Sequence, residues 1–193
     1  MNNFIVFDTE TTGLPDWKSP SGAENQPHIV QLAAHLVDAD KFKILQTMDV
    51  IVKPDGWVIP DVVTEIHGIS TEYASDVGVP EEVALDLFLE LWRRSNTRVA
   101  HNVRFDNRII RIATKRYCSD ELIDQWANGA YECTGLLSTP IMEMKPMNRF
   151  GFKMPKLAEA YKHFTGIELE NAHTAIADTN ACLAIYSAIQ KSL

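Results

Sequence analysis

The stretch from residue 4 to residue 14 constrains the fold of this chain most, because four apolar residues run directly into two acids, Asp8 and Glu10. An uninterrupted apolar run of this kind predicts a buried β-strand that ends in a charged site. Side chains two residues apart on a strand point to the same side of the sheet. Asp8 and Glu10 are therefore expected to share one face.

Two neighbouring carboxylates at the end of a buried strand need a counter-charge. Each desolvates and repels the other, so the arrangement is costly unless a cation or a shared proton relieves it. A divalent metal is the most economical relief, and hard oxygen ligands favour Mg²⁺ or Mn²⁺ over zinc. The alternative is a solvated pair of acids at a surface strand end. The apolar residues before the acids and the Thr-Thr-Gly turn after them favour the buried site.

Prolines and turn-forming residues fill the segment from 15 to 27, which predicts a long loop beside the two acids. Loops of this length in compact domains are often functional. Two further strands are predicted at 29–37 and 44–53. The short polar turn between them makes them an antiparallel pair, with the first strand as a neighbour.

The rest of the chain mixes predicted helices with short strands. We expect strands at 98–101 and 131–134, and helices at 60–66, from Ser70 onward, at 81–92, at 103–117, once after 119, from 154 to Gly166, and at 174–189. A loop is expected to contain Met142, Met144 and Met147, a cluster typical of adaptable core or of a lid. Strands followed by strand-helix units predict one mixed α/β domain over residues 1–193.

The net charge of −8 limits the kind of partner. Proteins that hold long nucleic acids by bulk electrostatics neutralise many phosphates, which is not expected of an acidic chain. A nucleic-acid enzyme of this charge would bind a short stretch locally, with metal ions supplying positive charge. Basic residues are concentrated between 93 and 116, where eight Lys or Arg accompany a single acid, Asp106.

Neither a secretory signal nor a membrane segment is expected. The first residues carry no basic region, the apolar run that follows is too short for a signal sequence, and no apolar run reaches transmembrane length. Cys118, Cys133 and Cys182 are odd in number and widely separated, which fits neither a disulfide framework nor a zinc site. We expect a cytoplasmic protein with reduced thiols.

Asp106 stands where the strand at 98–101 passes into the helix at 103–117. In open α/β sheets, ligands gather at the carboxyl ends of the strands. The helical residues on the same face as Asp106 are apolar, namely Ile109, Ile110, Ala113 and Tyr117. Asp106 therefore points inward, where an acid needs a partner such as a metal.

A basic stripe occupies the opposite face of this helix and consists of Arg104, Arg108, Arg111 and Lys115. Helical phase directs it away from the carboxylates. This direction favours a solvated face over a secondary contact with a nucleic-acid tail.

His173 and Asp178 are five residues apart, which is not a spacing that stacks two side chains on a helix. We expect His173 at or before the start of the last helix, on less regular backbone, and Asp178 inside its second turn. Neutral imidazole suits the abstraction of a proton from water near neutral pH. Taken alone, a histidine here would more often be a hydrogen-bonded structural residue.

Three spaced motifs together resemble those of one enzyme family. They are Phe-Asp-Thr-Glu-Thr-Thr-Gly at 7–13, His-Asn-Val-Arg-Phe-Asp at 101–106, and His-Thr-Ala-Ile-Ala-Asp at 173–178. In this order the chain resembles the DEDDh 3′-5′ exonucleases, the DnaQ-like group. The resemblance implies a ribonuclease H-like α/β fold with a five-stranded mixed sheet flanked by helices on both sides. It also implies dependence on Mg²⁺ or Mn²⁺ and release of nucleoside monophosphates from a 3′ end.

The resemblance also implies a role for individual residues. Four acids would hold two metal ions and a histidine would act as general base, namely Asp8, Glu10, Asp106 and Asp178 with His173. Residues that resemble substrate contacts of the family are Thr11, Gly13, Leu14, His67, Asn102 and Phe105, with Asn102 equally able to serve only in holding its loop. The loop at 15–27 departs from the family pattern, and its Trp17 would either stack on a base or pack against the core.

The leading functional hypothesis is a 3′-5′ exonuclease acting on single-stranded DNA or RNA. The alternatives are a proofreading exonuclease that acts with a polymerase or another replication or repair protein, a phosphodiesterase for dinucleotides, and a non-catalytic nucleic-acid-binding or protein-binding module. A binding module would be expected to lack one of the five acid and histidine positions. The few residues after 189 offer no tether to a polymerase, and a homodimer is the default expectation for oligomeric state.

Overall fold

The computed structural model describes residues 2–147, 149, 151–170 and 172–192. Its centre is a five-stranded mixed sheet in the order β3-β2-β1-β4-β5. The strands are β1 (Asn3–Thr11), β2 (Ile29–Asp38), β3 (Lys43–Ile51), β4 (Thr97–Ala100) and β5 (Tyr131–Cys133). The first three strands are antiparallel neighbours, whereas β4 and β5 run parallel to β1. This arrangement confirms the predicted fold class.

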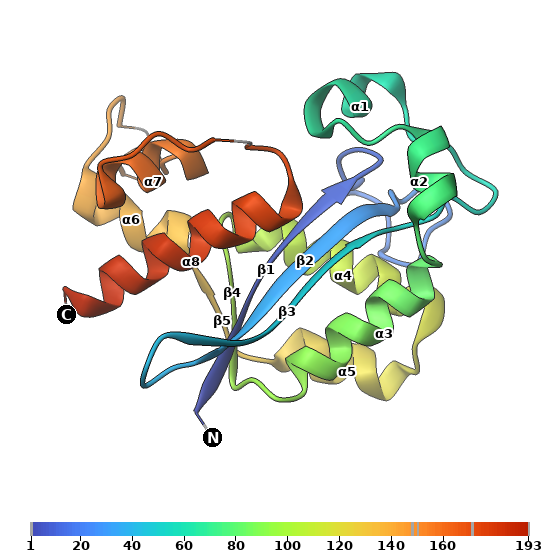
Figure 1. Cartoon of the computed structure of the whole chain (residues 1–193), viewed down its shortest axis with the longest axis horizontal. Helices are drawn as coiled ribbons and strands as arrows, with labels where there is room; N and C mark the ends of the chain where they lie inside the picture. Colours follow the sequence, from blue (N-terminus) through green and yellow to red (C-terminus); the bar gives the residue numbers. More distant parts are fainter. Residues whose placement is uncertain (1, 148, 150, 171, 193) are drawn as a thin grey trace.

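Helices cover both faces of the sheet (Figure 1). In chain order they are α1 (Asp61–His67), α2 (Thr71–Val77), α3 (Glu81–Trp92), α4 (Val103–Tyr117), α5 (Asp120–Asn128), α6 (Thr134–Met142), α7 (Leu157–Thr165) and α8 (Ala175–Lys191). None of the helices described is long and apolar enough to cross a membrane.

The alternation of β1 divides the core into two layers. Ile5 and Phe7 pack with side chains of α3, α4 and α5, whereas Phe4 and Val6 pack with Cys182 and other side chains of the α8 side. Because all four side chains are buried, β1 is covered on both faces. An acid further along β1, on either face of the strand, therefore lies in one of these buried layers.

The region after residue 119 departs most from prediction. The structure has a helix, α6, where a strand end and a loop were expected, so Met142 lies at the end of a helix. Helical propensity is weak here because Pro140 stands inside the helix, and its packing against α7 and α8 decides the conformation. The next helix begins at Leu157 rather than at 154, because Pro155 disfavours helical backbone in the residue before it.

Candidate active site

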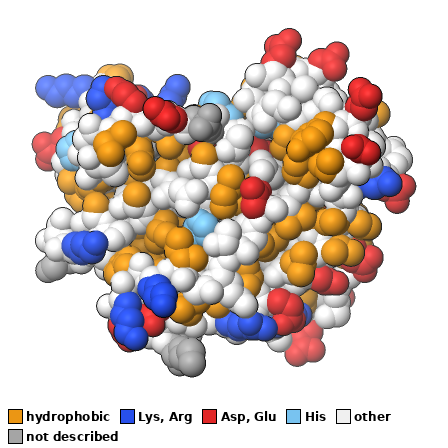
Figure 2. All heavy atoms as spheres, viewed as in Figure 1, with side chains coloured by type: hydrophobic (Ala, Val, Ile, Leu, Met, Phe, Trp, Pro, Cys, Tyr) orange, Lys and Arg blue, Asp and Glu red, His pale blue; other side chains and the backbone are white. Residues whose placement is uncertain are grey.

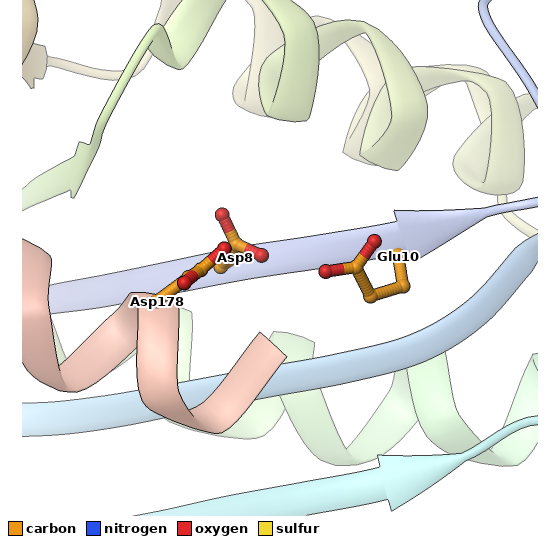
Figure 3. A group of neighbouring side chains, drawn as sticks. All are labelled: Asp8, Glu10 and Asp178. Carbon is orange, nitrogen blue, oxygen red and sulfur yellow. The ribbon is translucent and has the colours of Figure 1, made fainter. Parts of the chain in front are cut away.

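Asp8, Glu10 and Asp178 form the centre of the candidate site. Asp8 and Glu10 continue the face of β1 that packs against α8, and Asp178 lies in the first turn of α8 rather than the second. Each of the three offers a carboxylate oxygen within 4.8 Å of the others. Figure 3 shows the side chains of β1 and α8 turned toward one another across the space between the two elements.

Polar side chains of the sheet hold the start of α8 in place. The buried Gln31 of β2 accepts a hydrogen bond from the Ala175 amide at 3.0 Å and donates to the Asp49 carboxylate at 2.7 Å. Five residues further along α8, Asn180 contacts His35 of β2 at 2.9 Å, and His35 also contacts Thr47 at 2.8 Å. Because Gln31 satisfies an amide that a helix start leaves free, it sets the position from which Asp178 extends.

Asp106 reaches the site from the other layer of the molecule. Its Oδ1 accepts two hydrogen bonds from Thr9, at 2.8 Å from the hydroxyl and at 3.1 Å from the amide. Thr9 faces the α4 side of β1, so Asp106 lies outside the group formed by Asp8, Glu10 and Asp178. Thr9 was not among the residues predicted from the sequence. The sequence feature that could have indicated Thr9 is a hydroxyl residue between two acids, which strand alternation places on the opposite face of β1.

The electrostatics of the site reflect burial and mutual repulsion. Burial raises the pKa of Asp8 well above its ordinary value, and the charges of Asp106, Asp178 and Glu10 raise it further. Burial, with the charges of Asp178 and Asp106, raises the pKa of Glu10 to about 8. Asp106 has a pKa raised to about 7 by burial, although the hydrogen bonds from Thr9 lower it. The four carboxylates thus behave as one charged cluster.

The donor set of this cluster fits a divalent cation. Burial raises the pKa of Asp178, whose Oδ1 is buried and has no hydrogen-bond partner among the residues that the structure describes. An unpaired carboxylate oxygen that faces two further acids is costly unless a cation binds there. Asp8, Glu10 and Asp178 are therefore the residues that could hold a metal, with Asp106 placed to act from the opposite layer.

His173 lies just before α8, as expected. Its backbone has a φ of 71°, in the left-handed region, and its amide donates to Asp178 Oδ2 at 3.3 Å. The side chain is exposed, and a positive charge on it would lower the pKa of Asp178. The imidazole thus stands at the edge of the cluster, open to solvent.

The turn after β1 carries three of the predicted substrate contacts. The Thr11 hydroxyl donates to the Gly13 carbonyl at 2.8 Å and so closes the turn. Gly13 has a φ of 153° with open space where a side chain would start, and Leu14 is 83% exposed. An apolar side chain held out from a closed turn is available for contact with a ligand.

His67 ends α1 above this turn. The ring is buried, its Nδ1 accepts a hydrogen bond from the Ile69 amide at 3.1 Å, and burial lowers its pKa while the main chain of Thr11 opposes that shift. The structure therefore brings His67 next to the end of β1. Figure 2 shows a notch between the lobe of α1 and α2 and the lobe of α6 and α7.

The remaining predicted contacts lie around the start of α4. Asn102 is exposed and takes left-handed backbone, with a φ of 61°, directly before the helix. Phe105 packs against the core on the α4 side of the sheet. Trp17 is 48% exposed, and the Arg104 and Arg108 guanidinium carbons lie 4.7 and 5.8 Å from its ring centre. None of the three residues belongs to the group formed by Asp8, Glu10 and Asp178, and Trp17 and Asn102 lie beside the arginines of α4.

The predicted solvated stripe on α4 is only partly solvated. Arg108 donates to the carbonyls of Ser19 and Asp16 at 2.6 and 3.3 Å, and Arg116 of the same helix donates to the Gln26 carbonyl at 2.7 Å. The loop at 15–27 is therefore held against α4 by two arginines. Helical phase alone could not show this, because the loop that covers α4 comes from a distant part of the chain.

Comparison with known proteins identifies the family. Residues 5–186 match the family model described as Exonuclease, of the RNase T type. The chain belongs to this exonuclease family. The match includes all three motifs, so the resemblance found in the sequence is confirmed at the level of the family and of the DnaQ-like fold.

Relatives and solved structures of this exonuclease family agree. A DNA polymerase III subunit epsilon-like protein of Rhodobacter capsulatus is 31% identical over 92% of the chain, which spans 22% of that protein. A DNA polymerase III subunit epsilon of Treponema pallidum is 24% identical over 95% of the chain and 74% of its own length. Exonuclease I of E. coli in complex with a dT13 oligonucleotide has a TM-score of 0.75 and 22% identity over 98% of this chain and 41% of its own. The last comparison shows the shared fold.

Proposed function

We propose that this chain is a metal-dependent 3′-5′ exonuclease that releases nucleoside 5′-monophosphates from single-stranded DNA or RNA. The observation that carries the proposal is the convergence of Asp8, Glu10 and Asp178 within 4.8 Å, with Asp106 held behind them by Thr9. Membership of the exonuclease family supports the same reaction.

Divalent ions, Mg²⁺ or Mn²⁺, held by these four acids would lower the pKa of the attacking water and neutralise charge on the scissile phosphate and the departing 3′ oxygen. We propose two such ions, the number that the resemblance to the DEDDh exonucleases implies. The protein's own part is to hold the carboxylates in place, through Thr9 on one face of β1 and Gln31 at the start of α8.

His173 is the proposed general base. Its exposed imidazole accepts a proton from the attacking water at a ring nitrogen and passes it to solvent. The hydrogen bond from the His173 amide to Asp178 keeps the residue beside the cluster. Because the base is neutral when it accepts the proton, the rate is expected to fall on acidification.

The turn after β1 and the end of α1 form the proposed subsite for the terminal nucleotide. Leu14 extends from a closed turn toward solvent and is available to contact the last base. His67 lies beside Thr11 and borders the position of the terminal sugar. Asn102 and Phe105 at the start of α4, and Trp17 beside Arg104, are the proposed contacts for the strand that leads to this subsite.

The test is hydrolysis of 5′-labelled and 3′-labelled DNA and RNA strands by the purified chain with Mg²⁺. We expect stepwise shortening from the 3′ end with nucleoside 5′-monophosphates as the product. Asp8→Asn should reduce the rate by a factor on the order of 10³ or more, because it removes one ligand and one charge from the cluster. Asp124→Asn, which changes an exposed acid on α5, serves as the matched control. Undiminished hydrolysis by Asp8→Asn would refute the proposed mechanism.

A second candidate is proofreading in partnership with a polymerase. It is favoured by the relatives, two of which are named as DNA polymerase III subunit epsilon or epsilon-like. The chemistry at the site would be the same. Excision of a mispaired 3′ nucleotide that becomes faster when a replicative polymerase is added would support this function, whereas an unchanged rate would leave the stand-alone exonuclease.

A further inference from the structure

A second cavity lies on the outer side of α4, at the β5 edge of the sheet, with a volume of about 570 Å³. We call it the arginine-tryptophan pocket. Its lining comes from the loop after β1, from β4, β5, α4, α5 and α6, and from the segments before α4 and α7. It includes Trp17, Arg98, Asn107, Arg108, Arg111 and Trp126. None of the described residues that line it is an acid. In a chain of net charge −8, this is a local cationic site.

Arg98 forms the floor of the pocket and is only 2% exposed. Its guanidinium lies 3.9 Å from the centre of the Trp126 ring and donates to the Trp126 carbonyl at 2.5 Å. No acid of the described chain forms an ion pair with Arg98, and its Nε is buried without a hydrogen-bond partner. A buried cation with an unused donor is costly unless an anion or an acceptor reaches it.

Two further residues of the pocket lining contain a buried polar atom without a hydrogen-bond partner among the described residues. Asn107 Oδ1 and Arg108 Nε are buried and have no hydrogen-bond partner among the described residues. With Arg98 Nε, the lining residues that the structure describes therefore contain three buried polar atoms that the chain itself leaves unpaired. Arg104 and Arg111 at its rim are exposed and have no ion pair with any acid of the described chain, so they add positive charge that the protein does not neutralise.

Aromatic rings stand beside these charges. Trp17 lies under Arg104, and Tyr131 is 55% exposed with Arg98 5.5 Å from its ring centre. Aromatic faces interleaved with arginines bind single-stranded nucleic acid, because every base stacks on an aromatic ring and every linkage carries a negative phosphate. An acidic peptide would satisfy the arginines and leave the rings unused.

We infer that the arginine-tryptophan pocket binds a nucleotide unit, a base with its phosphate, upstream of the 3′ end held at the carboxylates. Asn102 lines the pocket and directly precedes α4, and Asp106 lies one turn further along the same helix on its other side. A strand that leaves the carboxylates along the start of α4 therefore meets this pocket next. The position of this pocket upstream of a 3′ end rests on the proposed function. The binding of a nucleotide unit in the pocket does not.

A base with its phosphate occurs both in the substrate strand and in a free mononucleotide, so the test includes both ligands. The test measures the binding of a 5′-fluorescein oligothymidine of about eight nucleotides in EDTA, where no metal-dependent hydrolysis occurs. Unlabelled dAMP and a glutamate peptide of similar charge are the competitors. The variants are Arg111→Ala, Arg104→Ala and the double substitution, and the matched control is Lys115→Ala, which removes a charge from α4 outside the pocket.

We expect the double variant to bind the oligonucleotide about tenfold or more weakly. The slope of log affinity against log salt should fall by about 0.7 for each phosphate that the variant no longer neutralises. Lys115→Ala should bind as the unmodified protein does. Melting temperatures identify any variant that does not fold. Arg111 is exposed, and its charge adds to burial in lowering the pKa of Arg108, so its removal should not destabilise the protein.

The outcomes separate the pocket from the proposed function. Unchanged affinity and salt slope in the double variant would overturn the inference, and the proposed function would stand if hydrolysis is intact. Arginine-dependent binding without hydrolysis would keep the pocket and refute the exonuclease. An affinity for dAMP equal to that for the oligonucleotide, with the same arginine dependence, would assign the pocket to a free nucleotide and overturn the upstream position. Equal displacement by the glutamate peptide would overturn the nucleotide class.

Discussion

Thr9 donates two hydrogen bonds to a single oxygen of Asp106, from its hydroxyl at 2.8 Å and from its amide at 3.1 Å. The two residues are 97 positions apart and belong to β1 and α4. Because Thr9 stands between Asp8 and Glu10, this contact joins the acids of one face of the strand to the acid that approaches the other. It makes β1 the common frame of Asp8, Glu10 and Asp106, whereas Asp178 comes from α8, whose start is held by Gln31 of β2.

Thr9→Val tests whether this contact positions Asp106. Valine keeps the shape of the side chain but lacks the hydroxyl donor, so Asp106 retains only the amide bond. We expect the rate of 3′-end hydrolysis to fall about 10- to 100-fold, as is common when a residue that orients a metal ligand is removed. Thr9→Ser retains the hydroxyl and should retain most of the rate. Equal rates for both variants, with unchanged affinity for Mg²⁺, would contradict the role.

The carboxylate cluster should make the metal-free protein less stable at alkaline pH. Glu10 and Asp106 have pKa values raised to about 8 and about 7, above the ordinary values of 4.5 and 3.8. Between the ordinary and the raised values the folded state binds protons that the unfolded chain has released. Stability therefore falls as pH rises from about 4.5 to about 8.

The measurement is the melting temperature in EDTA across this range, repeated with Mg²⁺. A loss of 1 kcal/mol corresponds to roughly 2–4 °C for a protein of this size. Mg²⁺ binds the ionised carboxylates and should restore stability at the alkaline end. A flat profile in EDTA, or one that Mg²⁺ leaves unchanged, would argue against a metal-binding cluster.

Asp8→Asn should raise the stability of the metal-free protein while it abolishes hydrolysis. The substitution removes a buried charge that repels Asp106, Asp178 and Glu10. We expect a higher melting temperature in EDTA near pH 8 and a smaller gain on addition of Mg²⁺. Asp124→Asn, at an exposed position, should change neither quantity. A destabilised Asp8→Asn variant would show that the carboxylate has a structural partner.

His173→Asn tests the proposed base without disturbing its backbone. Asparagine tolerates the left-handed conformation that His173 adopts, so the amide bond to Asp178 is retained. We expect the rate to fall about 10²- to 10⁴-fold and the acidic limb of the pH-rate profile to disappear. His163→Asn, on the exposed surface of α7, is the control. A retained acidic limb in the His173 variant would assign proton transfer to another group.

Gln31→Leu tests whether the start of α8 positions Asp178. The change removes the acceptor of the Ala175 amide and leaves that buried donor unsatisfied, at a cost of about 1–3 kcal/mol. We expect a lower melting temperature together with a lower kcat at saturating Mg²⁺. Gln46→Leu, on exposed β3, is the matched control. A loss of stability with full kcat would limit Gln31 to a structural role.

Local sequence determined the parts of this protein that depend on near neighbours. The apolar run before Asp8 predicted β1, strand alternation placed Asp8 and Glu10 on one face, and the irregular segment before α8 placed His173 outside the helix. Hydrophobic periodicity and turn chemistry act over a few residues, so they can be read without a fold.

Only the tertiary structure decided how distant segments meet. It placed Asp106 behind β1 through Thr9, covered part of the α4 stripe through the contacts of Arg108 with the loop at 15–27, and made α6 a helix despite Pro140. These outcomes depend on which layers pack together, because a contact between residues far apart in the chain leaves no periodic pattern in either segment. The fold and the acids were therefore predictable, whereas the residue that aligns Asp106 and the pocket beyond Asn102 were not.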